Sequence, residues 1–210
     1  MKYLLALLAV ISAQAQVPDL GSGGVWLPAH LGDLASKPEV PFQPWAKLKF
    51  QQNHTMKQSE ADLRCLPPGV PRIMLTPRPF EIVQTPNRIV FVYEGGAHVW
   101  RQVWMDGRPH PQDPNPNWLG HSIGHWEGKT LVVDSIGFND VTWLDDAGHP
   151  HTEQLHVIEK YTRTNPLTMK YEVLIDDPGA YTQTWGSSSS LSFRPGEKLA
   201  EDICLDKIPH

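Results

Sequence analysis

The sequence has no long apolar run after its N-terminus. Leu4 to Ile11 form an unbroken apolar stretch, which is much shorter than the roughly 20 residues of a membrane-spanning helix. Lys2 precedes this stretch, and the small residues Ala13 and Ala15 follow it, which is the order of a cleavable signal peptide. We therefore expect residues 1–15 to be removed on export. The mature protein would then be periplasmic or secreted and would have no membrane span.

Cysteine is nearly absent, since the chain contains only Cys65 and Cys204. Neither lies at the expected cleavage site, which excludes a lipid anchor on a mature N-terminal cysteine. Two cysteines in an exported protein favour a single disulfide. It would link the segment before the predicted strands to the segment after them, and two buried free thiols are the alternative.

The sequence also has no excess or cluster of basic residues. It contains 18 lysines and arginines against 23 aspartates and glutamates, and its formal net charge is −5. Binding to nucleic acid needs a concentrated positive surface, so a nucleic acid is not the expected partner. Eight tryptophans are many for this length, and their large rings suit stacking on flat ligands. A small molecule is therefore the expected partner, and the oligomeric state is left open.

Long helical patterns are scarce. Residues 16–65 are rich in glycine and proline, and we expect an irregular segment that packs on the rest of the protein, with a short helix at Lys57–Arg64. Residues 66–210 are expected to form one β domain. Its predicted strands are Pro79–Gln84, Arg88–Glu94, His98–Met105, Trp118–Trp126, Thr130–Ser135, Gln154–Thr164, Thr168–Ile175 and Tyr181–Ser187.

These eight or so short strands are joined mainly by hairpins, which predicts a mainly β fold. An antiparallel meander closed as a barrel is favoured over a sandwich. A parallel α/β fold is disfavoured, because it would need a crossover helix between strands. The interior of an eight-stranded barrel is just wide enough for one small ligand.

The segment Gly120–Gly124 (GHSIG) matches the nucleophile elbow of α/β hydrolases. That elbow works at a turn from a strand into a helix above a parallel sheet, whereas the residues that follow here predict a strand, a hairpin and another strand. The Ser-Asp-His order is met by Ser122, then Asp134 or Asp140, then His149, His151 or His156, but such spacings are easily met by chance. A serine hydrolase at Ser122 is therefore a minor hypothesis, and glycines that relieve crowding in a coiled strand are the simpler interpretation.

Histidines and carboxylates suited to proton transfer lie in and beside the same strands. His121 and His125 would share one face of an extended strand but lie about 13 Å apart, too far to bind one metal ion without a bulge. If the protein is an enzyme, the candidate catalytic residues are His121, His125, Asp134 and His156.

His149 and His151 form an H-x-H pair that is a candidate metal site. Extended backbone would point both imidazoles the same way, about 6.6 Å apart at the backbone. Asp145, Glu153 or His156 would complete the site. The favoured alternative is a solvated loop whose histidines interact only with nearby carboxylates. Apart from a divalent metal here, no cofactor is expected, and export argues against a cytosolic nucleotide cofactor.

The strand that contains Trp100, Arg101 and Trp104 carries polar side chains on both of its faces. If Arg101 is buried it needs a carboxylate partner, and Asp134 is the one we expect. Glu159, on another strand, is expected in a structural ion pair. The candidate ligand-binding residues are Arg101, Trp100, Trp104, Ser122, Trp126, Trp143 and Tyr171.

The run from Gly120 to Asp134 (GHSIGHWEGKTLVVD) resembles a widespread family of secreted bacterial proteins whose pattern is close to G-x-S-x-G-x-W-E-G-D-T-L-V-V-[DE]. Later runs resemble the same family, so the likeness covers roughly Cys65 to Trp185. One departure is Lys129, where the family usually has aspartate. The family carries no established activity, and what the resemblance implies is a lipocalin-like barrel and not a hydrolase fold.

The sequence as a whole predicts an exported, calycin-like barrel that binds a small organic molecule, such as a sugar or an aromatic metabolite. The alternative is a barrel enzyme that uses histidine and carboxylate for acid–base or metal-assisted chemistry, as a lyase, isomerase or hydrolase. A third hypothesis is a structural protein of the cell envelope without a pocket.

Overall fold

The predicted signal peptide and most of the helix expected before Cys65 lie outside the residues that the structure describes. The computed structural model describes residues 17–29, 33–34, 39–56, 63–95 and 99–204.

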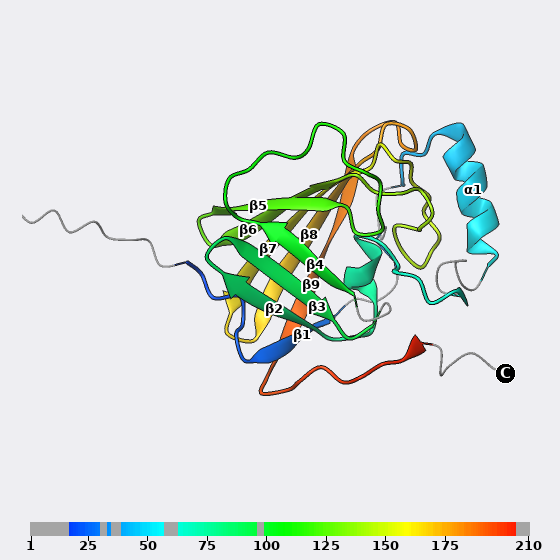
Figure 1. Ribbon diagram of the computed structural model, residues 1–210. Helices are drawn as coiled ribbons and strands as arrows, with labels where there is room; N and C mark the ends of the chain where they lie inside the picture. The colour runs from blue at the N-terminus through cyan, green and yellow to red at the C-terminus, as the bar shows by residue number, and fades with distance from the viewer. Residues whose placement is uncertain (1–16, 30–32, 35–38, 57–62, 96–98, 205–210) are drawn as a thin grey trace, which may run out of the picture.

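Within these residues, nine short strands form a closed barrel (Figure 1). The strands are β1 (Gly24–Pro28), β2 (Phe80–Thr85), β3 (Arg88–Tyr93), β4 (Trp100–Trp104), β5 (His121–Glu127), β6 (Thr130–Ile136), β7 (His156–Asn165), β8 (Thr168–Asp176) and β9 (Trp185–Pro195). Each strand pairs with the next along the chain, and β1 closes the barrel against β9. The predicted mainly β barrel is confirmed, with nine strands instead of about eight, and it is consistent with a calycin-like barrel.

One pair of neighbouring strands is parallel, whereas the sequence predicted an antiparallel meander throughout. Within the described strands, β4 and β5 are paired at Val103–Ser122 and Trp104–Ile123 alone. Parallel strands cannot be joined by a tight turn. Residues 105–120 therefore form a long connection over the outside of the barrel, seen as the green loop above β5 in Figure 1. We call it the β4–β5 connection.

The N-terminal segment is more regular than expected. It contributes β1 to the barrel and a helix, α1 (Pro44–His54). The helix begins at a proline, which is tolerated in a first helical turn. It buries only Ala46 and Asn53, so no apolar stripe reveals it in the sequence. No helix in the described part of the chain combines the length and the hydropathy of a bilayer span.

β9 is also longer than predicted, because it continues through a run of serines. Ser187–Ser190 pair with β8, and the following residues pair with β1. Pairing with β8 holds these serines extended, and Leu191 and Ser192 are paired with both β8 and β1. Gly186 is required where β9 approaches β8, since a Cβ there would lie 2.1 Å from the carbonyl oxygen of Val173.

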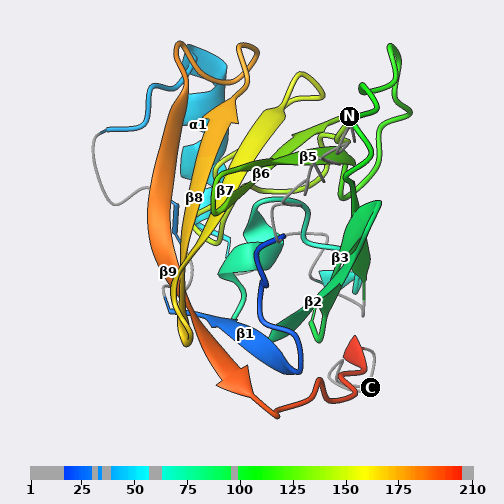
Figure 2. The ribbon, with the colours of Figure 1, turned by 90° about the vertical axis from the view of Figure 1, so that its left-hand side faces the viewer.

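Large side chains fill the barrel interior. Figure 2 shows β7, β8 and β9 on one side of the barrel and β2 and β3 on the other. The inward-facing residues of these walls are mostly aromatic or aliphatic, and the buried 3₁₀ turn η1 (Arg72–Leu75) adds to the same core. Fully buried members include Trp26, Phe80, Phe91, Tyr161, Tyr171 and Leu191.

An ion pair lies inside this core. Arg101 on β4 is 2 % exposed, and its Nη2 atom lies 2.5 Å from Oε2 of Glu159 on β7. The other carboxylate oxygen of Glu159 accepts hydrogen bonds from the hydroxyls of Tyr161 (2.8 Å) and Tyr171 (2.9 Å). Burial opposes the charge of Arg101, but its pairing with Glu159 raises its pKa above the ordinary value.

The prediction that Asp134 is the carboxylate partner of Arg101 was wrong. Side chains alternate between the two faces of a strand, and Asp134 lies on the outer face. On β6 the inward-facing neighbours are Val133 and Ser135, so Asp134 between them faces outward. Ser135 takes part in the interior cluster, because its hydroxyl accepts a hydrogen bond of 2.7 Å from Arg101. The expectation that Glu159 forms a structural ion pair is confirmed.

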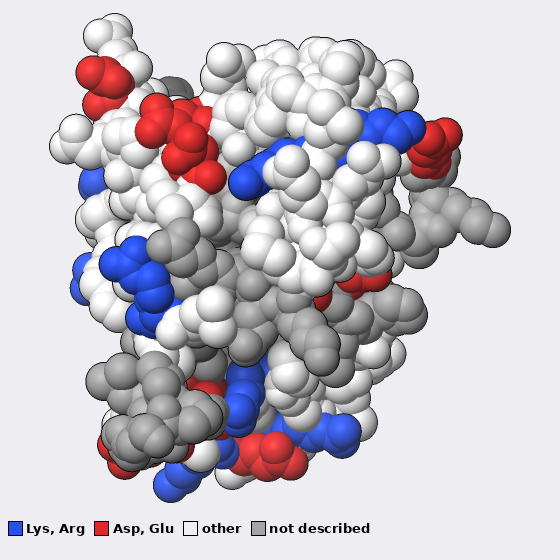
Figure 3. Space-filling model, turned by 90° about the vertical axis from the view of Figure 1, so that its right-hand side faces the viewer, with Lys and Arg blue, Asp and Glu red and all other residues white. Residues whose placement is uncertain are grey.

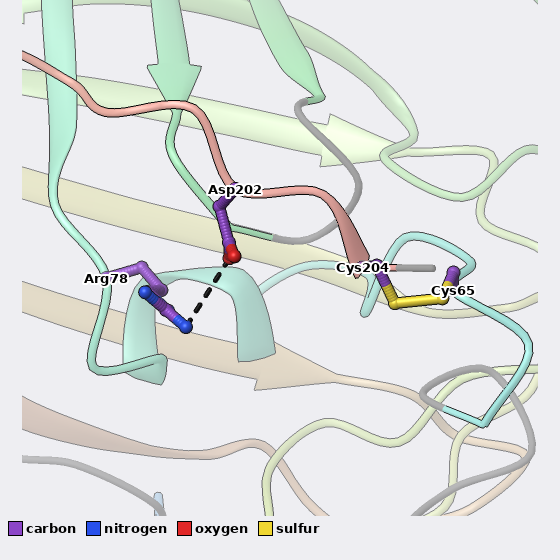
Figure 4. The surroundings of a disulfide bond; sticks show 4 residues. All are labelled: Cys65, Arg78, Asp202 and Cys204. Carbon is purple, nitrogen blue, oxygen red and sulfur yellow. Dashed lines mark ion pairs between the residues drawn. A yellow bond between two sulfur atoms is a disulfide. The ribbon is translucent and has the colours of Figure 1, made fainter. Parts of the chain in front are cut away.

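Cys65 and Cys204 form the predicted disulfide (Figure 4). It ties the chain after β9 to the segment before η1 across 139 residues. In a chain-entropy model, closing so long a loop stabilises the fold by about 4–5 kcal/mol. An ion pair between Arg78 and Asp202 (3.5 Å) lies beside the disulfide and holds the same C-terminal segment.

Charges of both signs are interspersed over the surface. On the face shown in Figure 3, lysines and arginines alternate with aspartates and glutamates among uncharged side chains. The described residues of this face form no patch of one sign. This distribution agrees with the absence of basic clusters in the sequence.

We expect Glu159→Leu to lower the free energy of unfolding by about 3–5 kcal/mol, because Arg101 would become an unpaired buried charge. The double variant Arg101→Met/Glu159→Leu should recover a substantial part of this loss, since neither charge would stay in the core. Urea unfolding followed by circular dichroism measures both. Glu172→Leu, on the outer face of β8, is the control and should change the stability by less than about 1 kcal/mol. A double variant as unstable as the single one would contradict this account of the core.

Candidate functional site

Three histidines and one aspartate are joined in a chain on the outer surface of the barrel. The Nδ1 atoms of His121 and His110 lie 2.8 Å apart, and Nε2 of His110 lies 3.0 Å from Oδ1 of Asp134. The same aspartate oxygen lies 2.7 Å from Nε2 of His156. We call these four residues the histidine cluster.

Neighbouring strands bring three of the four residues together. His121 on β5, Asp134 on β6 and His156 on β7 occupy outward-facing positions of three consecutive strands. His110 comes from the β4–β5 connection, where Pro109 and Pro111 flank it. The parallel pairing of β4 and β5 thus places His110 over β5 and β6.

The charge of Asp134 sets the direction of the hydrogen bonds. The hydrogen bond from His156 lowers the pKa of Asp134, and burial only partly opposes this. The resulting carboxylate can only accept, so His110 and His156 both donate from Nε2. In its neutral form, His110 with a proton on Nε2 can only accept at Nδ1, so His121 then donates from its own Nδ1. Nε2 of His121 is left as an unprotonated base.

The pKa values of the two outer histidines move in opposite directions. The hydrogen bond to Asp134 raises the pKa of His156. Burial lowers the pKa of His121, and the nearby positive charge of Arg108 acts in the same direction. Near neutral pH His121 is therefore the uncharged member, and its imidazole is free to accept a proton.

His121 forms part of the wall of a recess of about 530 Å³ between β4, β5 and the β4–β5 connection. The rings of Trp100, Trp104 and Trp118 line it, and we call it the tryptophan hollow. The recess opens where β4 and β5 separate beyond their two paired positions. The guanidinium of Arg108 lies over the ring of Trp104, with Cζ 3.6 Å from the ring centroid.

A second recess lies on the outer face of β5–β9, beyond the histidine cluster. Its volume is about 1180 Å³, and its lining mixes aliphatic side chains such as Ile158 and Leu174 with charged ones such as Lys160 and Glu172. Asp134 and Arg108 also line it. The histidine cluster therefore reaches both recesses, through His121 on one side and Asp134 on the other.

A third recess, of about 640 Å³, lies at the mouth of the barrel. Ile89 and Trp126 line it from the strands, and the N-terminal segment covers part of it. Gln84 holds that segment, because its side chain accepts a hydrogen bond from the amide of Leu20 (2.6 Å) and donates one to the carbonyl of Pro18 (3.0 Å).

The structure brings three of the four candidate catalytic residues together and leaves one apart. His125 lies away from the histidine cluster, where it is exposed and its Nε2 lies 3.3 Å from Oε1 of Glu127. Sequence reasoning missed His110. Its one signal is its position between two prolines in a long polar loop, which does not reveal that the loop folds back onto β6.

The candidate ligand-binding residues separate into three groups. Trp100 and Trp104 line the tryptophan hollow, and Arg101 and Ser122 border it while their side chains contact one another in the buried core. Trp126 lines the barrel mouth instead. Tyr171 lies in the core, where its hydroxyl contacts Glu159. Trp143 lies beside Arg72, and the Cζ atom of Arg72 is 5.5 Å from the centroid of the Trp143 ring. Neither Tyr171 nor Trp143 lines the hollow.

The two histidines of the candidate metal site have separate structural partners. Nδ1 of His149 lies 2.8 Å from Asp145, and its ring stacks on Phe42 at 5.5 Å between centroids. Nε2 of His151 lies 2.8 Å from the hydroxyl of Thr142, and burial lowers its pKa. The described residues contain no group of three or more histidine, cysteine, aspartate or glutamate side chains arranged to hold a metal ion.

The GHSIG segment does not form a nucleophile elbow. Ser122 is buried inside the barrel, where its hydroxyl lies 3.0 Å from Nε of Arg101 and 2.9 Å from the hydroxyl of Ser135. A hairpin and not a helix follows it. Gly120 has a φ of +68°, and a Cβ on Gly124 would lie 2.8 Å from side-chain atoms on β4 and the start of the β4–β5 connection. The glycines therefore serve close backbone approach, as the simpler interpretation expected.

No protein-family model, curated protein or solved structure matches this chain. The resemblance of residues 120–134 to a family of secreted bacterial proteins therefore stays a prediction.

We expect Asp134→Asn to lower the pKa of His156 towards its ordinary value, because the raised pKa depends first on the hydrogen bond to that carboxylate. An NMR titration of the imidazole signals measures the shift. Glu127→Gln removes an exposed carboxylate beside His125 and is the control, which should leave His156 unchanged. An unaltered His156 titration in Asp134→Asn would contradict the hydrogen-bond chain.

The same variant should have a stability defect that depends on pH. A raised histidine pKa stabilises the fold below the ordinary value of 6.5 and loses this effect as the pH rises through the folded value. A lowered aspartate pKa stabilises the fold above the ordinary value of 3.8 and loses this effect as the pH falls through the folded value. The defect in urea unfolding should therefore be largest between these two values and smaller at pH 8.

Proposed function

We propose that this is an exported protein that binds a small organic molecule, a sugar or an aromatic metabolite, in the tryptophan hollow. The observation that carries the proposal is the meeting of three indole rings and one imidazole around a single recess of about 530 Å³. Ligand sites in proteins typically have volumes of roughly 300–1,000 Å³, with apolar and aromatic walls and a few polar groups.

The chemistry of the wall favours a flat ring that carries hydroxyl groups. Trp100 and Trp118 offer ring faces for stacking on an aromatic or sugar ring, while Arg108 already lies over one face of Trp104. Gln102 also lines the hollow, and its amide can both donate and accept hydrogen bonds. Nε2 of His121 accepts a hydrogen bond from a ligand hydroxyl. Rings would supply the contact area, and these polar groups would set the orientation.

The barrel interior offers less room than the tryptophan hollow. Aromatic side chains and the Arg101–Glu159 pair fill its middle, and residues 17–22 lie across its mouth. The recess at the mouth is the competing location for a ligand, and Trp126 is its aromatic wall.

Export is supported by the disulfide between Cys65 and Cys204, because such bonds persist in oxidising compartments. The signal-peptide pattern of residues 1–15 and the resemblance to secreted bacterial proteins point the same way.

The test is a titration of the purified protein with p-nitrophenol, p-nitrophenyl glucoside and glucose, followed by tryptophan fluorescence and calorimetry. We expect saturable binding of at least one of these ligands. Trp100→Ala should weaken it roughly 2- to 12-fold, because one aromatic contact is worth about 0.5–1.5 kcal/mol. Trp100 is 60 % exposed, so its removal should leave the fold intact.

Trp45→Ala is the matched control, because Trp45 is 45 % exposed and lies on α1, remote from the hollow. It should bind as the unaltered protein does. Binding that Trp126→Ala weakens and Trp100→Ala does not would place the ligand at the barrel mouth and refute the site proposed here. Absence of saturable binding by all three ligands would also count against it.

A further inference from the structure

We propose that the tryptophan hollow is an active site in which His121 is the general base for hydrolysis of an ester of a flat alcohol, such as a phenol or a sugar. His110 and Asp134 act as positioning residues behind it. This inference rests on the proposed ligand site, since the same rings would hold the alcohol part of the ester.

The geometry supplies a base at the wall of the hollow. His121 uses Nδ1 to reach His110, so its reactive nitrogen is Nε2, and no described residue forms a hydrogen bond with that atom. The partners behind His121 fix its tautomer, as they do for the base of a Ser-His-Asp triad. The difference is that a second imidazole stands between the base and the carboxylate.

This second imidazole gives the accepted proton a place to go. When Nε2 of His121 takes a proton, its Nδ1 proton can pass across the 2.8 Å contact to Nδ1 of His110. The positive charge then lies on His110, whose Nε2–H faces Asp134 at 3.0 Å. A carboxylate beside an imidazolium stabilises it, so the chain lowers the cost of protonating His121.

A single base is enough for this reaction. His121 removes a proton from water, and the hydroxide oxygen forms a bond to the ester carbonyl carbon. The bond from that carbon to the alcohol oxygen then breaks, and the leaving alkoxide takes the proton back from His121. Ester and water become acid and alcohol, and His121 ends neutral, so the cycle closes without a second acid.

The exposed pair of His125 and Glu127 offers an internal comparison. It also places an imidazole beside a carboxylate on β5, at 3.3 Å, but it lies outside the tryptophan hollow and lacks the bridging imidazole. If a surface imidazole alone were sufficient for hydrolysis, His125 would serve as well as His121.

The probe is p-nitrophenyl acetate, whose ring fits the aromatic walls and whose hydrolysis releases coloured p-nitrophenolate. We expect the protein to hydrolyse it faster than the same concentration of free imidazole. His121→Gln should reduce kcat/KM by about 100-fold or more, as the loss of a general base does. His125→Gln should leave kcat/KM unchanged.

The positioning residues should act on kcat and on the pH profile. Asp134→Asn and His110→Gln should each lower kcat with little change in KM, because neither residue lies in the wall of the hollow. The rate should rise as His121 loses its proton, with an inflection below pH 6.5, since burial and the charge of Arg108 lower the pKa of His121. Asp134→Asn should move this inflection to still lower pH, because the carboxylate favours the protonated chain.

His121→Ala with added imidazole tests the same role without relying on one substitution. Added imidazole should raise hydrolysis by His121→Ala above the rate of imidazole alone and should add no more than that rate to His125→Ala, which keeps its own base. A wild-type rate equal to that of free imidazole, or full activity in His121→Gln, would overturn the inference. If fluorescence shows that p-nitrophenol still binds in that case, the ligand site stands and only the catalytic role falls. If p-nitrophenol does not bind and the rate is also that of free imidazole, both proposals fall.

Discussion

The buried pair of Arg101 and Glu159 is the constraint on which the arrangement of the barrel depends. A guanidinium and a carboxylate that are both withdrawn from water must meet, so β4 and β7 are fixed across the interior from one another. The tyrosine hydroxyls of β7 and β8 complete the pair. Because Arg101 points inward, Trp100 and Trp104 must point outward, which places two walls of the tryptophan hollow on the surface.

The hollow itself depends on the parallel pairing of β4 with β5. An antiparallel hairpin would have kept these strands paired along their length and left no recess between them. The parallel pairing lets them separate after two positions and requires a long connection, which carries His110. The tryptophan hollow and the bridging imidazole thus both follow from the parallel pairing of β4 with β5, whereas the other neighbouring strands are antiparallel.

Short strands joined by hairpins in the sequence were sufficient to predict the barrel, and the candidate list contained three of the four residues of the histidine cluster. The predicted strand order placed His121, Asp134 and His156 on neighbouring strands, and strand alternation showed that Arg101 and Trp100 lie on opposite faces. It could not choose which face is inside, because both carry polar and apolar groups, and the carboxylate assigned to Arg101 was therefore wrong. The sequence did not predict β1, because glycines and prolines surround it. It did not predict α1 either, because this helix buries too little apolar surface to show a pattern. His110 could not be placed, since nothing local to a proline-rich loop specifies which strand it covers.

His121, Asp134 and His156 lie on strands whose backbone pairing forms the barrel. His110, the fourth member of the histidine cluster, lies on a loop outside this pairing. Residues 106–116 take part in no described strand pairing or β-bridge, so they can change without altering a strand register. Variation there would replace the imidazole that contacts His121 and Asp134 while the strands that carry those two residues stay in place. The surroundings of His121 could therefore diverge in evolution while the barrel is kept.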